Sequence, residues 1–351
     1  MNVLLGLLFH SVGGFASGSF YMPFKKVKDW AWESYWIIGG LFSWLIVPPL
    51  LAWLTVPGFA EIIRNTSFNI LSITYIMGVL WGIGGLTYGL GVRYLGMSLG
   101  NSVILGLDAA FGALVPAIYY SFVHIPNKVS FTQMISHSGG QLVLLGVAVC
   151  LLGIAISGRA GMKKEQEISP EASKQSVKEF SLVKGLIIAV ISGILSAFFN
   201  FGIESGKPMA EAAVHAGFNP LFQNNVTFVV LLWGGLTTNL IWSMILNFKN
   251  KTFGDYTNKL TPLARNYFFA GLAGTIWFLQ FFFYGMGESK LGNGASSWIL
   301  HMSTIILTAN MWGFYNKEWK GVTKRTLTLI LAGVLIILMS VVIVGIGNSI
   351  N

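Results

Sequence analysis

Residues 326–347 read TLTLILAGVLIILMSVVIVGIG, a run without a single charged side chain. A hydrocarbon core about 30 Å thick needs about 20 apolar residues at a helical rise of about 1.5 Å each, so this run predicts a membrane-spanning helix. Because such runs are continuously apolar and do not alternate, they exclude a porin-like barrel. Stretches of this kind recur along the chain and predict ten spans: 3–22, 32–54, 70–92, 95–121, 139–158, 182–204, 221–247, 266–287, 292–313 and 326–347.

The composition agrees with a polytopic membrane protein. Of 351 residues, 54% are hydrophobic and 10% are charged, against about 25% charged in an ordinary soluble domain. This shortage of charge excludes a cytosolic enzyme, a disordered protein and a nucleic-acid binder. The net charge of +9 does not change that conclusion, because the 22 Lys and Arg residues are scattered between apolar runs and form no basic face. The single cysteine, Cys150, excludes an intrachain disulfide.

The basic residues also predict the orientation. Eighteen of them lie in the loops after the first, third, fifth, seventh and ninth spans, and four lie in the other loops. Since loops rich in Lys and Arg stay in the cytoplasm, both termini are predicted to lie outside it. The first span has no basic residue before its apolar stretch, so we interpret it as a retained helix and not as a cleaved signal peptide.

An internal repeat divides the chain. The longest polar stretch, 159–181, is rich in Lys, Glu and Ser and predicts a flexible cytoplasmic linker. It separates two regions of five spans, 1–158 and 182–351, and an odd number of spans per region inverts the second relative to the first. The sequence therefore predicts an all-α integral membrane protein built as a 5+5 inverted repeat.

Two similar segments at equivalent positions of these regions support that prediction. Residues 81–96 read WGIGGLTYGLGVRYLG and residues 277–292 read WFLQFFFYGMGESKLG. Both fit W-x6-Y-G-h-G-x3-L-G, where h is apolar, so that Trp81 and Tyr88 correspond to Trp277 and Tyr284. Inverted repeats are typical of transporters with a substrate site near the membrane midplane. The alternative is that these aromatic side chains serve only in packing or at the membrane interface.

Ionisable groups inside the spans are the next candidates, because each costs about 2.5–3.5 kcal/mol to insert at the midplane. Three lie well inside: His10, Asp108 and His301. Histidine titrates near neutral pH, which suits proton coupling, but a neutral histidine can also donate a structural hydrogen bond. Asp108 has the same two interpretations, a functional carboxyl or a protonated structural one. Glu33, at a span end, is either a coupling carboxylate or a hydrated charge at the headgroups.

Other chemistry is missing from the sequence. No G-x-x-x-x-G-K-[ST] phosphate loop, H-E-x-x-H motif or C-x-x-C pair occurs. We therefore expect no metal, no cofactor and no enzymatic activity.

Several stretches together resemble the L-rhamnose–proton symporter family of the drug/metabolite transporter superfamily. They cover nearly the whole chain in order: FYMPFKKVKDWAWE at 20–33, LWGIGGLTYGLGVRYLGMSLG at 80–100, KPMAEAA at 207–213, WFLQFFFYGMG at 277–287, SWILHMS at 297–303 and KEW at 317–319. The resemblance implies a ten-helix inner-membrane sugar–proton symporter. Asp108, Glu204 and the segment 288–296 depart from the family pattern. The residues that match the pattern are His10, Lys25, Lys26, Trp32, Glu33, Arg93, Lys207, Glu211, Gln280 and His301.

The leading hypothesis is therefore an importer of L-rhamnose, or a closely related deoxyhexose, in symport with protons. Aromatic faces suit sugar C–H surfaces and amides suit hydroxyls, so the expected substrate-binding residues are Trp81, Tyr88, Trp277, Gln280, Tyr284 and His301. The expected proton-coupling residues are His10, Asp108 and Glu33. We expect a sugar, protons and the bilayer as partners, with no nucleic acid and no obligate protein partner. The alternatives are an exporter or exchanger of another small metabolite, a membrane-bound enzyme and a non-transporting subunit.

The predicted orientation can be tested with reporter fusions at Asn351. Because the eighteen-to-four charge asymmetry places this residue outside the cytoplasm, alkaline phosphatase fused there is expected to be active and green fluorescent protein to be dark. The reverse pattern would refute the orientation.

Overall fold

The computed structural model describes residues 2–122, 130–168, 180–291 and 294–350. Within these ranges all regular structure is helical and no strand occurs, which confirms the all-α prediction. Most helices are α, and a π-helical segment and two short 3-10 segments interrupt them.

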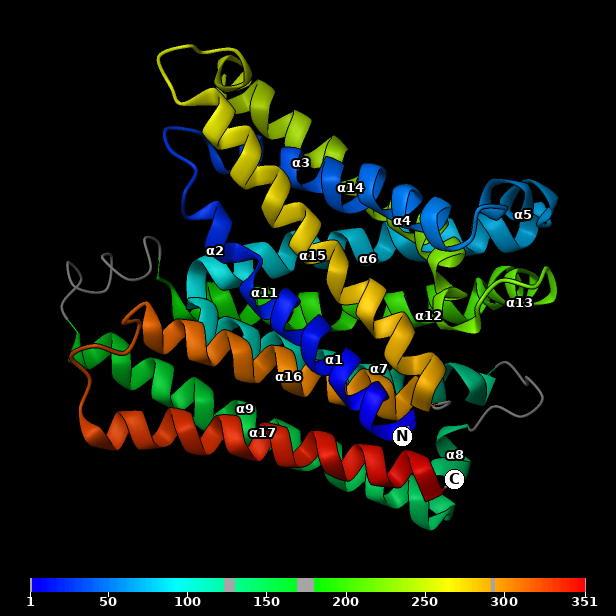
Figure 1. Cartoon of the computed structure of the whole chain (residues 1–351). Coiled ribbons are helices and arrows are strands. Elements are labelled where there is room, and N and C mark those ends of the chain that lie inside the picture. The colour runs from blue at the N-terminus through cyan, green and yellow to red at the C-terminus, as the bar shows by residue number, and fades with distance from the viewer. Residues whose placement is uncertain (1, 123–129, 169–179, 292–293, 351) are drawn as a thin grey trace. The chain divides into compact units, whose positions relative to one another are not determined.

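The helices form two compact units, each of which combines segments from early and late in the sequence (Figure 1). Unit 1 comprises Met1–Gly85 and Phe198–Lys290, and unit 2 comprises Leu86–Ala197 and Leu291–Asn351. Unit 1 contains α1 (Asn2–Ser19), α2 (Tyr21–Phe24), α3 (Trp32–Gly40), the π segment η1 (Leu41–Ile46), α4 (Val47–Thr55), α5 (Phe59–Asn65), α12 (Phe198–Ser205), α13 (Lys207–His215), η2 (Pro220–Phe222), α14 (Asn224–Asn250) and η3 (Phe253–Tyr256). Unit 2 contains α7 (Met97–Phe122), α8 (Phe131–Ser136), α9 (Ser138–Glu167), α11 (Leu182–Ser196), α16 (Gly294–Tyr315) and α17 (Lys324–Ile350). Two long helices, α6 (Phe68–Leu95) and α15 (Leu263–Leu291), contribute to both units.

Seven helical stretches in the described residues are long and apolar enough to cross a membrane. They are Trp32–Thr55, Phe68–Leu95, Ser138–Lys164, Leu182–His215, Pro220–Asn250, Leu263–Leu291 and Lys324–Gly347, and each overlaps one of the ten predicted spans. The other three predicted spans, 3–22, 95–121 and 292–313, largely coincide with α1, α7 and α16. That these three also cross the membrane stays a prediction.

In unit 2, α9 and α17 lie antiparallel along most of their length (Figure 1). The buried side chains of α17 recur every three or four residues, at Ile330, Val334, Ile337, Val341 and Val344. Its opposite side exposes a second apolar stripe, formed by Leu331, Leu335, Met339, Val342 and Ile346. An exposed apolar stripe of this length would be unfavourable in water, so it is best explained as a lipid-facing surface.

The C-terminal end of α9 differs from the sequence prediction. The predicted linker begins at residue 159, yet α9 continues to Glu167. Lys164 is only 1% exposed, with its amine 4.9 Å from the ring centroid of Trp319 and 5.1 Å from that of Phe180. Glu318, which interacts with Lys164 electrostatically, also accepts a hydrogen bond from the backbone N–H of Ser98 at 3.1 Å. The KEW motif thus buries a lysine that hydropathy alone assigns to solvent.

In unit 1, the backbones of α6 and α14 are in contact where the two helices cross. A Cβ added to Gly78 would lie 1.9 Å from the carbonyl oxygen of Leu231, and one added to Gly234 would lie 2.1 Å from that of Tyr75. Small residues permit this close approach. In lipid, where no hydrophobic force brings helices together, such close packing drives their association.

Replacing Gly78 by alanine is expected to lower the melting temperature of the purified protein, because the added methyl group cannot be accommodated without separating the two helices. Overpacking of this kind costs about 1–3 kcal/mol. Gly85→Ala is the matched control on the same helix, because a Cβ at Gly85 meets nothing within 4 Å. Equal melting temperatures for both variants in a thermal-shift assay would contradict the close crossing.

Glu167 caps the start of α17. Its carboxylate accepts the backbone N–H of Thr323 at 2.8 Å and the hydroxyl groups of Thr323 and Thr326 at 3.0 Å and 2.7 Å. These hydrogen bonds, the backbone one foremost, hold the pKa of Glu167 below its usual value. A lowered pKa stabilises the fold above the pKa of the unfolded chain, about 4.3 for glutamate, and that contribution is lost as the pH falls through the folded value.

Glu167→Gln is therefore expected to melt below the wild type at pH 7, with a difference that shrinks as the pH falls below about 4, where glutamate itself becomes neutral. Melting curves of both proteins, recorded at steps of about one pH unit between pH 3 and pH 7, measure this difference in melting temperature. A difference that stays constant over the whole range would show that the carboxylate charge plays no part.

Candidate functional site

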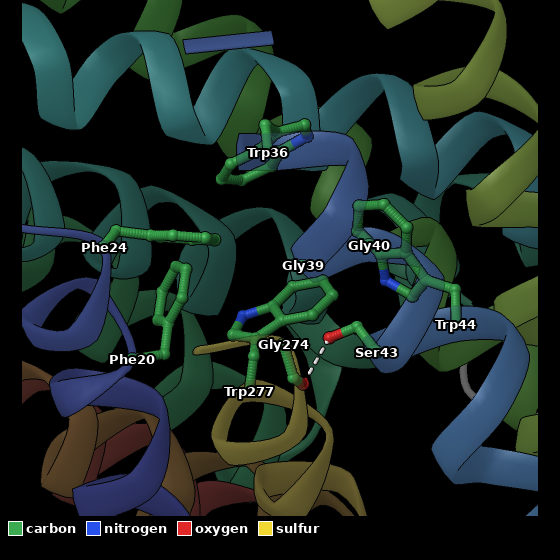
Figure 2. Close-up of a pocket in the computed structure, with 9 residues that line it drawn as sticks. All are labelled: Phe20, Phe24, Trp36, Gly39, Gly40, Ser43, Trp44, Gly274 and Trp277. Carbon is green, nitrogen blue, oxygen red and sulfur yellow. Dashed lines mark hydrogen bonds between the residues drawn. The ribbon is translucent and has the colours of Figure 1, made fainter. Parts of the chain in front are cut away.

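Unit 1 contains a pocket with about 210 Å³ of space that no atom fills, part of it open to the surroundings (Figure 2). Five aromatic residues, three glycines and one serine line it: Phe20, Phe24, Trp36, Trp44, Trp277, Gly39, Gly40, Gly274 and Ser43. Such a wall offers ring faces to C–H groups and very few polar atoms, so it suits a ligand with an apolar side.

The π segment η1 brings two tryptophans to this pocket. Pro48 lacks an N–H and its ring crowds the carbonyl four residues earlier, which favours a wider turn just before it. Two α-helical turns take about 7.2 residues, whereas Trp36 and Trp44 are eight residues apart. The wider π turn makes up the difference, and both rings line the pocket, with ring centroids 6.3 Å apart. At these prolines the helix is therefore widened and continues as α4.

The helix that carries Trp277, α15, packs closely against the segment formed by α3 and η1. Ser43 donates its hydroxyl hydrogen to the carbonyl oxygen of Gly274 at 2.7 Å (Figure 2). A Cβ on Gly274 would lie only 1.9 Å from the carbonyl oxygen of Gly39, so glycine is required there. These contacts fix the ring of Trp277 edge-on to that of Trp44, with centroids 5.3 Å apart and an interplanar angle of 84°.

The two repeat tryptophans meet each other. Trp81 and Trp277 stack with ring centroids 5.6 Å apart and an interplanar angle of 10°. Both are buried, so neither faces lipid. Trp277 lines the pocket, whereas Trp81 packs behind it against Phe199 and Phe281, at 4.9 Å and 5.7 Å. Of the two, only Trp277 is placed to touch a ligand in this pocket.

Three other predicted residues of unit 1 lie along or beside α15. Gln280 is buried, one turn after Trp277. Tyr284, one turn further along, has its ring centroid 5.5 Å from that of His10. A Cβ on Gly287 would lie 2.5 Å from Nε2 of His10, so the second glycine of the Y-G-h-G motif makes room for the imidazole.

Glu33 lies elsewhere in unit 1, at the start of α3. It is buried, and its Oε1 accepts hydrogen bonds from Nδ2 of Asn250 and Oγ1 of Thr252, both at 2.9 Å. The carboxylate thus joins the start of α3 to the end of α14. Asp255, from the same loop, accepts hydrogen bonds from Ser34 and from the backbone N–H of Ala31.

The remaining predicted residues, Tyr88, Asp108 and His301, belong to unit 2 and are largely buried. Tyr88 donates its hydroxyl hydrogen to Oδ1 of Asn101 and interacts electrostatically with Asp108. Oδ1 of Asp108 is enclosed and has no hydrogen-bond partner among the described residues. His10 belongs to unit 1 and His301 to unit 2, so their sharing of one cavity stays a prediction.

Sequence reasoning missed Trp36, Trp44 and Ser43. The signal was present, because two tryptophans eight residues apart precede a Pro-Pro pair, but a regular helical period does not place them on one side.

Comparison with known proteins adds to this geometry. The family model described as L-rhamnose-proton symport protein matches residues 1–350. The L-rhamnose-proton symporters of Yersinia pestis (strain Pestoides F) and Yersinia pseudotuberculosis serotype O:1b are each 38% identical to the chain over 352 residues, which is 99% of this chain and 98% of theirs. That of Shigella dysenteriae serotype 1 is 36% identical over the same shares. The chain is therefore a multi-pass membrane protein that belongs to the L-rhamnose–proton symporter family, a family of transporters and not of enzymes.

Proposed function

We propose that this chain imports L-rhamnose, or a closely related deoxyhexose, in symport with protons. The observation that carries the proposal is the family match over residues 1–350, with relatives named L-rhamnose-proton symporter that align along almost their full length. The aromatic pocket of unit 1 gives it a physical basis. A 6-deoxyhexose has an apolar methyl group and a C–H face, which ring faces bind, and hydroxyls for a few polar groups.

The same geometry supports our choice of substrate residues. Trp277 lies on the pocket wall, and Gln280 follows it on α15 with a buried side chain. An amide offers both a donor and an acceptor, which suits a sugar hydroxyl. We retain Trp81 as the support behind Trp277, and Tyr88, Tyr284 and His301 as further proposed contacts.

The coupling residues are proposed on similar grounds. Asp108 has an enclosed carboxylate oxygen without a partner among the described residues, which supports a site that takes up a proton. His10 lies against Tyr284 and Gly287, so a change in its charge would be felt along α15. Glu33 already accepts two hydrogen bonds from one oxygen, which supports a structural role for it within the proposal.

The proposed architecture is ten spans in a 5+5 inverted repeat. One observation supports this architecture. The second glycine of each Y-G-h-G motif lies near the first helix of the opposite region. Gly287 contacts His10 of α1, and Gly91 lies near Ile188 of α11. Each compact unit likewise combines early and late segments. We further propose the bacterial inner membrane as location, with both termini outside the cytoplasm, on the strength of the charge asymmetry.

Uptake into proteoliposomes tests the function. With an inside-negative potential of about 100 mV, worth about 2.3 kcal/mol per charge, the wild type is expected to accumulate labelled L-rhamnose roughly 50-fold and to lose this with a protonophore. His10→Gln is expected to keep sugar counterflow while losing proton movement and accumulation.

A panel of sugars and other small metabolites in the same vesicles identifies the substrate. Accumulation driven by an outward gradient of another metabolite, without L-rhamnose uptake, would favour an exporter or exchanger instead. If His10→Gln keeps full accumulation and Asp108→Asn loses it, the aspartate carries the proton and the histidine does not.

A further inference from the structure

Trp44 has an indole N–H without a hydrogen-bond acceptor in the part of the chain that the structure describes. The side chain is 2% exposed, and its Nε1 atom has no hydrogen-bond partner among the described residues. Buried indole N–H groups usually find a partner, and an enclosed donor without one is unfavourable. The Nε1 atoms of Trp30, Trp233 and Trp319 share this feature, and Trp44 differs from them because it lines the pocket.

Neighbouring polar groups of the same wall are already paired. The indole N–H of Trp36 donates to Oδ1 of Asn239 at 2.9 Å, and the hydroxyl of Ser43 donates to Gly274 at 2.7 Å. The amide of Asn239 in turn donates to the carbonyl oxygens of Gly82 and Gly235. Two tryptophans on one helix thus differ in one respect, because the donor of Trp36 is bonded and that of Trp44 is not.

The orientation of Trp44 places this donor at the pocket. The benzene part of its ring lies over Gly40, where an added Cβ would come within 2.2 Å of it. The edge that carries the nitrogen is turned toward Trp277 and Ser43 in Figure 2. The π segment is what brings residue 44 to this side of the helix, and π segments often occur at functional sites.

The donor defines the chemistry of what it binds. An indole N–H only donates, so its partner must be an acceptor such as a hydroxyl or ring oxygen. The rings of Trp36 and Trp277, with centroids 6.3 Å and 5.3 Å from that of Trp44, flank the position and favour an oxygen next to a C–H face. A pyranose presents this combination.

We infer that Trp44 is a specificity-determining residue whose N–H donates a hydrogen bond to one oxygen of the sugar held against Trp277. The inference rests on the proposed function and adds a polar contact to a pocket whose other lining groups select for apolar surface. It explains why a transport protein retains an unpaired donor in a wall of this kind, since the sugar completes the pairing.

Binding of L-rhamnose to the full-length purified protein tests this, with Trp44→Phe and Trp36→Phe as a matched pair. Trp44→Phe is expected to raise the Kd by about two- to twelvefold, the range for one neutral hydrogen bond. Its melting temperature without sugar should fall less than that of Trp36→Phe, because both variants leave a cavity but only Trp36→Phe also breaks a hydrogen bond. Trp36→Phe should melt lower, because it leaves Asn239 without its donor.

Monodeoxy analogues of L-rhamnose separate the hydrogen bond from simple loss of ring contact. The analogue that lacks the accepting oxygen is expected to bind the wild type and Trp44→Phe with the same Kd, while Trp36→Phe weakens all analogues by one common factor. If Trp44→Phe leaves the Kd for L-rhamnose unchanged, or weakens every analogue equally, the inference is overturned.

The role of Trp44 can be refuted without refuting the proposed function. If the wild type transports L-rhamnose and Trp44→Phe binds it equally well, only the role of Trp44 falls. If the wild type neither binds nor transports L-rhamnose, the proposed function falls and the role of Trp44 with it.

Discussion

Backbone contact between helices at glycine is the constraint on which the rest of this structure depends. In lipid there is no hydrophobic force to bring helices together, so close packing and interhelical hydrogen bonds must do so. The contacts of Gly78 with Leu231, of Gly274 with Gly39 and of Gly153 with Ile337 are all too close for an added methyl group unless the helices shift. Because the helices meet at their backbones, large side chains are displaced from these crossings and gather beside them. The aromatic cluster of unit 1 lies next to such a crossing, with Trp277 one turn after Gly274.

The candidate pocket arises where this packing meets an irregular helix. A regular helix through Pro48 would lose a hydrogen bond and strain one carbonyl, and the π segment relieves that strain by widening one turn. The widened turn carries Ser43 to the carbonyl of Gly274 and brings Trp44 over Gly40. The irregularity thus determines which side chains face the pocket, and it does so through backbone geometry that tolerates little variation.

The sequence predicts the elements of this protein better than its site, for reasons visible in particular residues. Apolar run lengths suffice for spans such as Trp32–Thr55 and Lys324–Gly347, because bilayer thickness sets their length. The repeat motif pointed to Trp81 and Trp277, and these two rings do stack. Trp44 could not be placed, because its position depends on a turn that departs from the period of 3.6 residues. Lys164 was assigned to a hydrated linker for a related reason, since hydropathy cannot show that Phe180 and Trp319 would cover it.

Hydrogen-bond pairing distinguishes the polar groups that hold the fold together from the polar groups that are available for function. Glu33, Glu167 and Glu318 all accept hydrogen bonds from neighbouring chain segments, and removing any of them would leave donors unpaired. Asp108 and Trp44 are buried as deeply as Glu33 and Glu318, yet each belongs to the larger set of side chains that have an enclosed polar atom without a partner among the described residues. An unpaired carboxylate oxygen is stabilised by a proton, and an unpaired N–H by an acceptor. A sugar–proton symporter binds one ligand of each kind, and Asp108 and Trp44 are the positions that we propose for the proton and the sugar.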